Sequence, residues 1–290
     1  MTLTTEDIAT RETASQRTVR WQGRRRKLLI HAAQIALFIV IFGGWQLFTQ
    51  LKIIDPFFFG QPSGIVSKLG TWITQGTAYG SLGAEIWVTM KEALLGFVIG
   101  VAGGVLFGLL LGQFRFLSDV AGPYIKAANA LPRIVLGSVF VVWLGLGVSS
   151  KVMLAAVLVF FVVFFNAFQG VREVDDHLIA NVRVLGASRL QVIRHVILPS
   201  AMTWIIASLH VAFGFSIIGA IVVEFLGAQQ GLGLIISNAQ GQFDADGVFA
   251  AMLIIAVIAL TAEWLIGLLE RRLLAWRPQS GSGSGEARAA

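Results

Sequence analysis

The stretch ALLGFVIGVAGGVLFGLLLG, residues 93–112, decides the fold of this chain. It contains no charged side chain, and every fourth residue from 96 onward is glycine. A helix rises about 1.5 Å per residue, so about 20 mostly apolar residues span a hydrocarbon core of about 30 Å. The stretch therefore predicts a membrane-spanning helix with one face free of side chains.

The composition extends this prediction to the whole chain. Of its 290 residues, 56% are hydrophobic and 13% are charged, and the mean hydropathy is +0.78. Soluble domains carry about 25% charged residues, so this chain has too little charge to cover a soluble surface. The composition excludes a soluble enzyme, a nucleic-acid binder and a disordered chain. The absence of cysteine further excludes disulfide scaffolds, zinc–thiolate sites, iron–sulfur clusters and cysteine nucleophiles.

Six segments are long and apolar enough to cross a membrane, and none alternates with the period of two that a β-barrel strand needs. We therefore predict an all-α, polytopic membrane protein with six transmembrane helices. Pro123 and Pro132 interrupt the third segment, which we expect to be broken at these residues. The expected spans cover residues 28–48, 93–112 with an amphipathic lead-in from 82, 120–147, 152–168, 204–226 and 248–269.

The basic residues predict the topology. Seven Lys or Arg residues fall within residues 1–27, which we interpret as a cytoplasmic arm ahead of a six-helix domain at 28–275. Positive charge recurs in the loop 171–199 and just after residue 270, so both termini and this loop are expected in the cytoplasm. The Ser/Gly-rich end, residues 276–290, is expected to be a flexible tail. The net charge of +6 is thus a topology signal, and we expect no nucleic-acid partner.

Four glycines share one face of the second span: Gly96, Gly100, Gly104 and Gly108. A face of glycines lets the backbone of a second helix approach closely, which is one way that helices pack in lipid. We interpret this face as a helix-packing surface, with a conduit wall or a moving interface as the alternative.

Several residues inside the spans are candidates for a translocation pathway. Freed backbone beside a proline is tolerated at membrane depth only within protein or beside a cavity, and ionisable side chains there usually face one. A plain kink, a structural carboxylate, a neutral histidine and interhelical hydrogen bonding are the alternatives for individual members. Lys91 and Glu92 are interpreted instead as an interfacial pair. The pathway candidates are Pro132, Arg133, Ser138, Asn166, His210 and Glu224.

The loop between the fourth and fifth spans reads VREVDDHLIANVRVLGASRLQVIRHVILP, residues 171–199. It predicts two short helices, of which the first begins at Asp175 or Asp176 and ends at Gly186. Ser188 is placed to cap the second helix, and Pro199 to end it before the next span. A rigid surface helix pair with a basic face is typical of a docking element, and an ordinary interfacial loop is the alternative.

The sequence contains no catalytic motif that we can identify. It has no G-x-x-x-x-G-K-[ST] phosphate-binding loop, no H-E-x-x-H, no G-x-S-x-G and no cluster of acid and base residues. We therefore expect no enzyme activity, no metal site and no cofactor in this chain. Uphill transport would need a partner or an ion gradient to supply the energy.

The loop resembles the cytoplasmic signature of the membrane subunits of bacterial binding-protein-dependent ABC importers. That signature is E-A-A, three residues, Gly, nine residues, then I-x-L-P. Gly186 is followed at this spacing by Val196-Ile197-Leu198-Pro199, whereas Ala180-Asn181-Val182 replaces E-A-A. Further segments between about residues 55 and 275 look like the nitrate/sulfonate/taurine branch: Pro56, Pro62-Ser63, Leu95-Gly96-Phe97, Gly100, Pro132-Arg133-Ile134, 143–147, 224–228 and Gly231-Leu232-Gly233. Val135 and Ser138 depart from that branch within the suspected pathway.

The resemblance implies a type I ABC importer permease in the bacterial inner membrane, surrounded by lipid and paired with a second copy of itself. It implies cytosolic ABC ATPase subunits that bind ATP and Mg, and a periplasmic or lipid-anchored solute-binding protein. The solute would be a small anion such as a sulfonate, taurine or nitrate. The ATPase-docking residues would be Gly186, Ala187, Ser188, Arg189, Arg194, Leu198 and Pro199.

Other functions remain open on the sequence alone. A secondary transporter driven by an ion gradient would use Glu224 and His210 as a relay, but the internal repeat expected of that class is not visible. A membrane-embedded enzyme or assembly factor would need an acid/base cluster. Within the ABC importers, a permease for a thiamine-precursor-like metabolite is the alternative substrate assignment.

Overall fold

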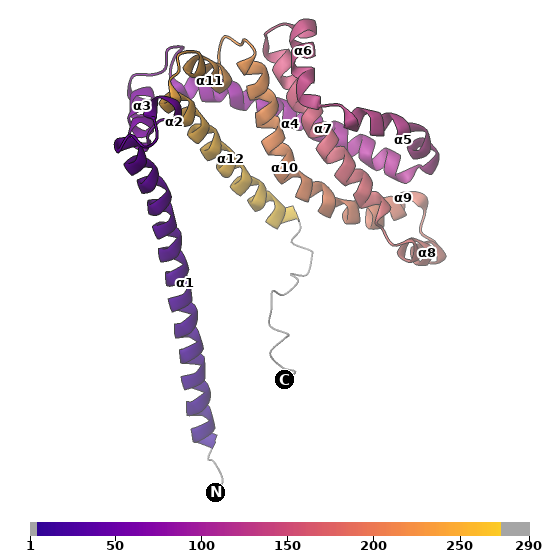
Figure 1. The fold of residues 1–290 in the computed structure, drawn as a ribbon. Coiled ribbons are helices and arrows are strands. Elements are labelled where there is room, and N and C mark those ends of the chain that lie inside the picture. Colours follow the sequence, from indigo (N-terminus) through magenta and orange to yellow (C-terminus); the bar gives the residue numbers. More distant parts are fainter. Residues whose placement is uncertain (1–4, 274–290) are drawn as a thin grey trace. The chain divides into compact units, whose positions relative to one another are not determined.

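The computed structural model describes residues 5–273, which belong to two compact units, residues 1–67 and 68–290 (Figure 1). The expected tail, 276–290, lies outside the described residues. In the first unit, helix α1 (Thr5–Gln50) is continuous through the expected basic arm, and its apolar part begins at Leu28. The short helix α2 (Pro56–Phe59) follows, and then α3 (Pro62–Thr74) begins.

Three long helices form the centre of the second unit. They are α4 (Leu82–Gln113), α7 (Val148–Arg172) and α10 (Leu198–Phe225), and Figure 1 shows them side by side. Helix α4 begins at the expected lead-in, where the Ser81 side chain caps it. Helix α12 (Ala245–Leu273) packs on α10 through an apolar cluster that includes Phe213 and Ile217.

The glycine face of α4 lies directly against α7. A methyl group added at Gly100 would lie 2.6 Å from the carbonyl oxygen of Ala156, and one at Gly108 would lie 2.6 Å from the Cβ of Ala167. Gly96 and Gly104 leave as little room. These helices therefore touch backbone to backbone, at a distance that only glycine permits.

The third expected span is broken, but at only one of its two prolines. Helix α5 (Arg115–Ala130) continues through Pro123, so the break expected there is wrong; transmembrane helices tolerate proline because neighbouring groups satisfy the freed carbonyl. The break falls at Pro132, after which the 3-10 turn η1 (Arg133–Val135) leads into α6 (Leu136–Leu144). The two arms, residues 116–130 and 133–144, differ in direction by 75°.

Among the described residues, five helices are long and apolar enough to cross a membrane, and the bent pair supplies a sixth if it counts as one span. Large apolar side chains such as Phe38 and Val142 are exposed, while charged ones such as Glu85 and Glu224 are buried. This distribution suits a hydrocarbon surrounding rather than water. Within residues 5–273 the secondary structure is helical, with a single isolated bridge between Thr77 and Gly80, so the all-α prediction is confirmed.

Candidate functional site

The loop between α7 and α10 forms the expected pair of short helices. Helix α8 (Asp176–Val184) begins where the Asp175 carboxylate accepts a hydrogen bond from the His177 N–H at 2.8 Å. It ends at Val184, two residues before Gly186, whose φ of +87° is the left-handed conformation that glycine adopts without strain. The N–H of Gly186 donates to the carbonyl of Arg183 at 2.9 Å, which closes the end of the helix.

A capping box starts the second helix, α9 (Arg189–Val192). The Ser188 N–H donates to the Gln191 side chain at 2.8 Å, and the Gln191 N–H donates to Ser188 Oγ at 3.4 Å. The turn between α8 and α9 is therefore closed by hydrogen bonds on both sides of Ala187, and its shape is set by its own sequence.

Pro199 does not end this second helix, contrary to the expectation from sequence. Helix α9 passes through a π-turn, η2 (Ile193–Ile197), directly into α10, so one helix runs from Arg189 to Phe225. In the π-turn the Leu198 N–H reaches the Ile193 carbonyl, five residues back. Pro199 is the second residue of α10, so the π-turn lies directly before it, where the ring of a proline would clash with the preceding turn of a regular helix.

Three large apolar side chains surround the α8–α9 turn and face outward. Val184, Leu185 and Leu190 are 86%, 84% and 73% exposed, and we call them the docking patch. The space beside Gly186, at the centre of the patch, is open. These three residues were not among the docking residues predicted from the sequence, although two bulky apolar residues directly before a glycine that follows a helix indicate an exposed apolar turn.

Arg189 and Arg194, the two arginines expected on the basic face, lie in different environments. The Arg189 guanidinium lies 5.2 Å from the centre of the Phe114 ring, at the end of α4. Arg194 lies in the π-turn and is exposed. Leu198 and Pro199 are half-buried at the start of α10.

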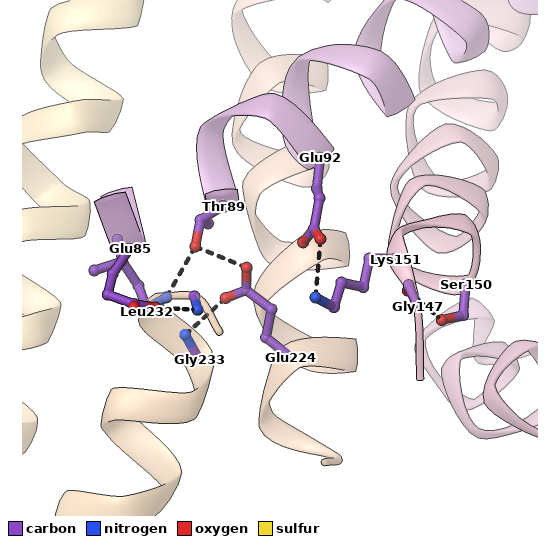
Figure 2. A network of polar contacts seen from close by, with 10 residues as sticks. Glu85, Thr89, Glu92, Gly147, Ser150, Lys151, Glu224, Leu232 and Gly233 are labelled. Atoms are coloured by element: carbon purple, nitrogen blue, oxygen red, sulfur yellow. Dashed lines mark hydrogen bonds and ion pairs between the residues drawn. The ribbon is translucent and has the colours of Figure 1, made fainter. Parts of the chain in front are cut away.

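A second polar feature lies at the opposite end of the same three helices, around the short helix α11 (Leu232–Gly241) (Figure 2). The first backbone N–H groups of α11 donate to buried side chains: Gly231 to Glu85 at 2.5 Å, Leu232 to Thr89 at 2.9 Å and Gly233 to Glu224 at 2.7 Å. The Thr89 hydroxyl donates in turn to Glu224 at 2.7 Å. Negative side chains at a helix N-terminus are stabilising, so this cluster caps α11.

Beside this cap, Glu92 of α4 forms a buried ion pair with Lys151 of α7 at 2.8 Å. The expected pairing of Glu92 with Lys91 is wrong, because successive residues of a helix point in different directions and Lys91 is exposed. The second carboxylate oxygen of Glu92 has no hydrogen-bond partner among the described residues. A pocket of about 580 Å³ borders the pair and is also lined by Lys91, Gln229 and Gln230.

The structure does not bring the six pathway candidates together: Pro132, Arg133 and Ser138 lie at or near the bend, while Asn166 lies in α7 and His210 and Glu224 lie in α10. No hydrogen bond or ion pair within residues 5–273 joins any two of them. Arg133 donates to Asn129 at 2.5 Å and lies over the Phe161 ring, while Asn166 donates to the carbonyl of Val162 in its own helix. Pro132 lies at the bend and Ser138 lies after it in α6, and both are exposed.

The two ionisable candidates in α10 each have partners. Glu224 is fully buried and belongs to the cap of α11. His210 lies between two carboxylates of α12, with Nδ1 at 2.7 Å from Glu263 and Nε2 at 3.2 Å from Glu270. Both side chains thus tie α10 to neighbouring helices.

Comparisons with known proteins agree on one family. Residues 104–275 match the family described as binding-protein-dependent transport system inner membrane component. A putative aliphatic sulfonates transport permease of Bacillus subtilis is 31% identical, over 88% of each chain. A riboflavin transport system permease of Chloroflexus aurantiacus is 30% identical (80% of this chain, 85% of the relative), and the taurine transport system permease of Escherichia coli is 29% identical (87% and 90%).

Solved structures with the same fold include ABC transporters. The inward-facing MetNI methionine ABC transporter superimposes with a TM-score of 0.59 at 17% identity, over 66% of this chain and 95% of that one. An amino acid ABC transporter gives a TM-score of 0.55 at 22% identity, over 72% and 97%. At these identities the likeness concerns the fold alone.

Proposed function

Because this chain belongs to the family of binding-protein-dependent transport system inner membrane components, we propose that it forms the solute pathway of an ATP-driven importer and contacts the ATPase at the α8–α9 turn. The family implies an ATPase and a solute-binding protein as partners. ATP and Mg are then held by the ATPase, and this chain contributes no group to hydrolysis.

The docking patch is the observation that carries the coupling role. Val184, Leu185 and Leu190 are almost fully exposed on a turn whose backbone is fixed by hydrogen bonds. A rigid, exposed apolar turn indicates a binding site for another protein, because exposed apolar clusters mark interaction sites. Arg194 beside it favours acidic residues on that partner and a faster encounter.

The continuous helix from Arg189 to Phe225 suits the transmission of force. A push on the α8–α9 turn acts directly on α10, with no flexible joint between them. Glycine contacts of α4 with α7, and of Gly219 in α10 with Ala155 in α7, join these three helices into one body. Rocking of such bodies between inward and outward access is an established form of switching.

The remaining architecture follows from the coupling role. Each chain supplies one docking turn, so two ATPase subunits that close together need two chains, and we propose a homodimer. The docking end of α4, α7 and α10 then faces the cytoplasm, as do both termini. Arg172, Arg183 and Arg194 at this end support that orientation.

We propose a small organic anion as the solute, with a sulfonate or taurine first. Two relatives carry sulfonate and taurine names, and the exposed Lys91 lines a pocket at the end opposite the docking turn, beside the Glu92–Lys151 pair. The riboflavin name of another relative favours a neutral, vitamin-like solute as the second candidate. Pro132, Arg133 and Ser138 at the bend remain our candidates for the pathway itself.

Uptake measurements in cells that express the chain with its ATPase and binding protein test the proposal. We expect uptake of labelled taurine or riboflavin to collapse when ATP is depleted and to survive a proton uncoupler. The opposite pattern would identify an ion-gradient-driven transporter. Co-purification of a P-loop ATPase with the wild-type chain is the second expected result.

A further inference from the structure

A pocket of about 350 Å³ lies where α4, α7, α8 and α9 meet, and the charged residues that line it are all basic. Arg172, Arg183 and Arg189 line it, together with apolar residues such as the buried Val171 and Val192. No lining residue is acidic. We call it the arginine pocket.

The three guanidinium groups have no anionic partner in the described part of the chain. None of them belongs to an ion pair there. Arg172 and Arg189 instead lie over aromatic rings, with guanidinium-to-ring distances of 5.3 Å to Phe168 and 5.2 Å to Phe114. Ring contacts hold these groups in place and leave their N–H donors available, and like charges gathered around one cavity favour an anion between them.

The place of the pocket along the helices points to the source of that anion. Gln113 and Arg172, which line the pocket, lie one and four residues beyond the ends of the expected spans 93–112 and 152–168. The pocket therefore lies at the level where a helix leaves the hydrocarbon and meets lipid headgroups. Basic pockets between transmembrane helices at this level suit anionic headgroups.

We propose that the arginine pocket binds the phosphate of an anionic phospholipid of the cytoplasmic leaflet, with the apolar residues beneath contacting its glycerol and upper acyl atoms. The assignment to the cytoplasmic leaflet rests on the orientation in the proposed function. A bound lipid would bridge α8 to the ends of α4 and α7, and so support the docking turn from the membrane side.

Lipid binding to the purified full-length chain in detergent tests this proposal. Native mass spectrometry compares added phosphatidylglycerol with phosphatidylethanolamine. We expect the wild-type chain to prefer phosphatidylglycerol by tenfold or more. Each arginine near an anionic headgroup contributes about fivefold, so Arg172→Gln with Arg183→Gln should weaken phosphatidylglycerol binding about 25-fold.

A charge-matched control distinguishes lipid binding in the arginine pocket from the non-specific attraction of an anionic lipid to basic residues. Arg194→Gln with Arg271→Gln removes the same charge from exposed positions outside the pocket lining, and should change binding by less than threefold. Arg172→Lys with Arg183→Lys keeps the charge and should retain most of the binding. An equal loss in the control pair would overturn the proposal.

Two further outcomes also count against it. If inorganic phosphate binds the wild-type chain and displaces phosphatidylglycerol at millimolar concentration, the pocket is a site for a free anion. If the 172/183 variant keeps its lipid but no longer co-purifies with the ATPase, the pocket receives an acidic segment of that protein. Neither readout measures transport, so failure here leaves the permease function standing.

Discussion

Lys151 at the start of α7 donates a hydrogen bond to Glu92 of α4 across 2.8 Å, and both side chains are buried. Removing two charges from water is costly, and loss of one partner leaves an uncompensated buried charge that destabilises the fold. Glu92 lies one helical turn before Gly96, where the glycine face begins. The pair therefore links α4 to α7 at one end of their contact.

We predict that Lys151→Met destabilises the protein strongly. It leaves the Glu92 carboxylate buried and unpaired, which costs about 3–5 kcal/mol. Thermal unfolding in detergent measures the loss. Lys91→Met is the matched control, because Lys91 is exposed on the same helix as Glu92, and it should leave the unfolding temperature within a degree or two. The double variant Lys151→Met with Glu92→Leu should recover most of the loss, and additive losses in the double variant would contradict a direct pair.

Thr89→Val should loosen the cap of α11. The Thr89 hydroxyl accepts from the Leu232 N–H and donates to Glu224, so its removal leaves buried polar groups unsatisfied at a cost of about 1–3 kcal/mol. Thr89→Ser keeps the hydroxyl and should keep most of the stability. Hydrogen exchange over residues 231–241 is the measurement, and equal exchange in the two variants would argue against this capping role.

Gly100→Ala should destabilise the contact between α4 and α7. Its methyl group would lie 2.6 Å from the Ala156 carbonyl oxygen, and overpacking of this kind costs about 1–3 kcal/mol. Gly83→Ala in the same helix is the control, because its added methyl group meets nothing within 4 Å and alanine favours a helix over glycine by about 1 kcal/mol. Unfolding temperatures should move in opposite directions, and a shared direction would exclude close packing as the cause.

The features of the fold that depend only on neighbouring residues in the sequence could be predicted. The glycine face and the turn at Gly186 and Ser188 depend on spacing and backbone preference within a few residues. The π-turn before Pro199 could not be predicted, because a proline after a short helix is equally compatible with the end of that helix and with a helix that continues. The partner of Glu92 stands 59 residues away on another helix, so only packing reveals it.

The spacing of the polar residues in α4 contains information about the cap of α11 that the sequence predictions did not use. Glu85, Thr89 and Glu92 follow the spacing of one helix face, and that face continues into Gly96 and the later glycines. The pattern predicts a buried polar surface against a neighbouring helix. It does not reveal that the neighbours include the backbone of α11, since any helix N-terminus offers the same donors.

Gly186→Glu should uncouple ATP hydrolysis from transport while leaving the protein folded and inserted in the membrane. Gly186 has a φ of +87°, and a Cβ added there meets no atom within 4 Å. The substitution costs about 1–2 kcal/mol of local strain and places a charge in the middle of the docking patch. Gly186→Asn is the control, because asparagine tolerates the left-handed conformation and adds no charge. We expect the glutamate variant to lose ATPase co-purification and uptake, and the asparagine variant to keep both. Normal uptake by the glutamate variant would remove the α8–α9 turn from the coupling path, since a buried charge at the centre of a protein interface cannot be neutral in energy.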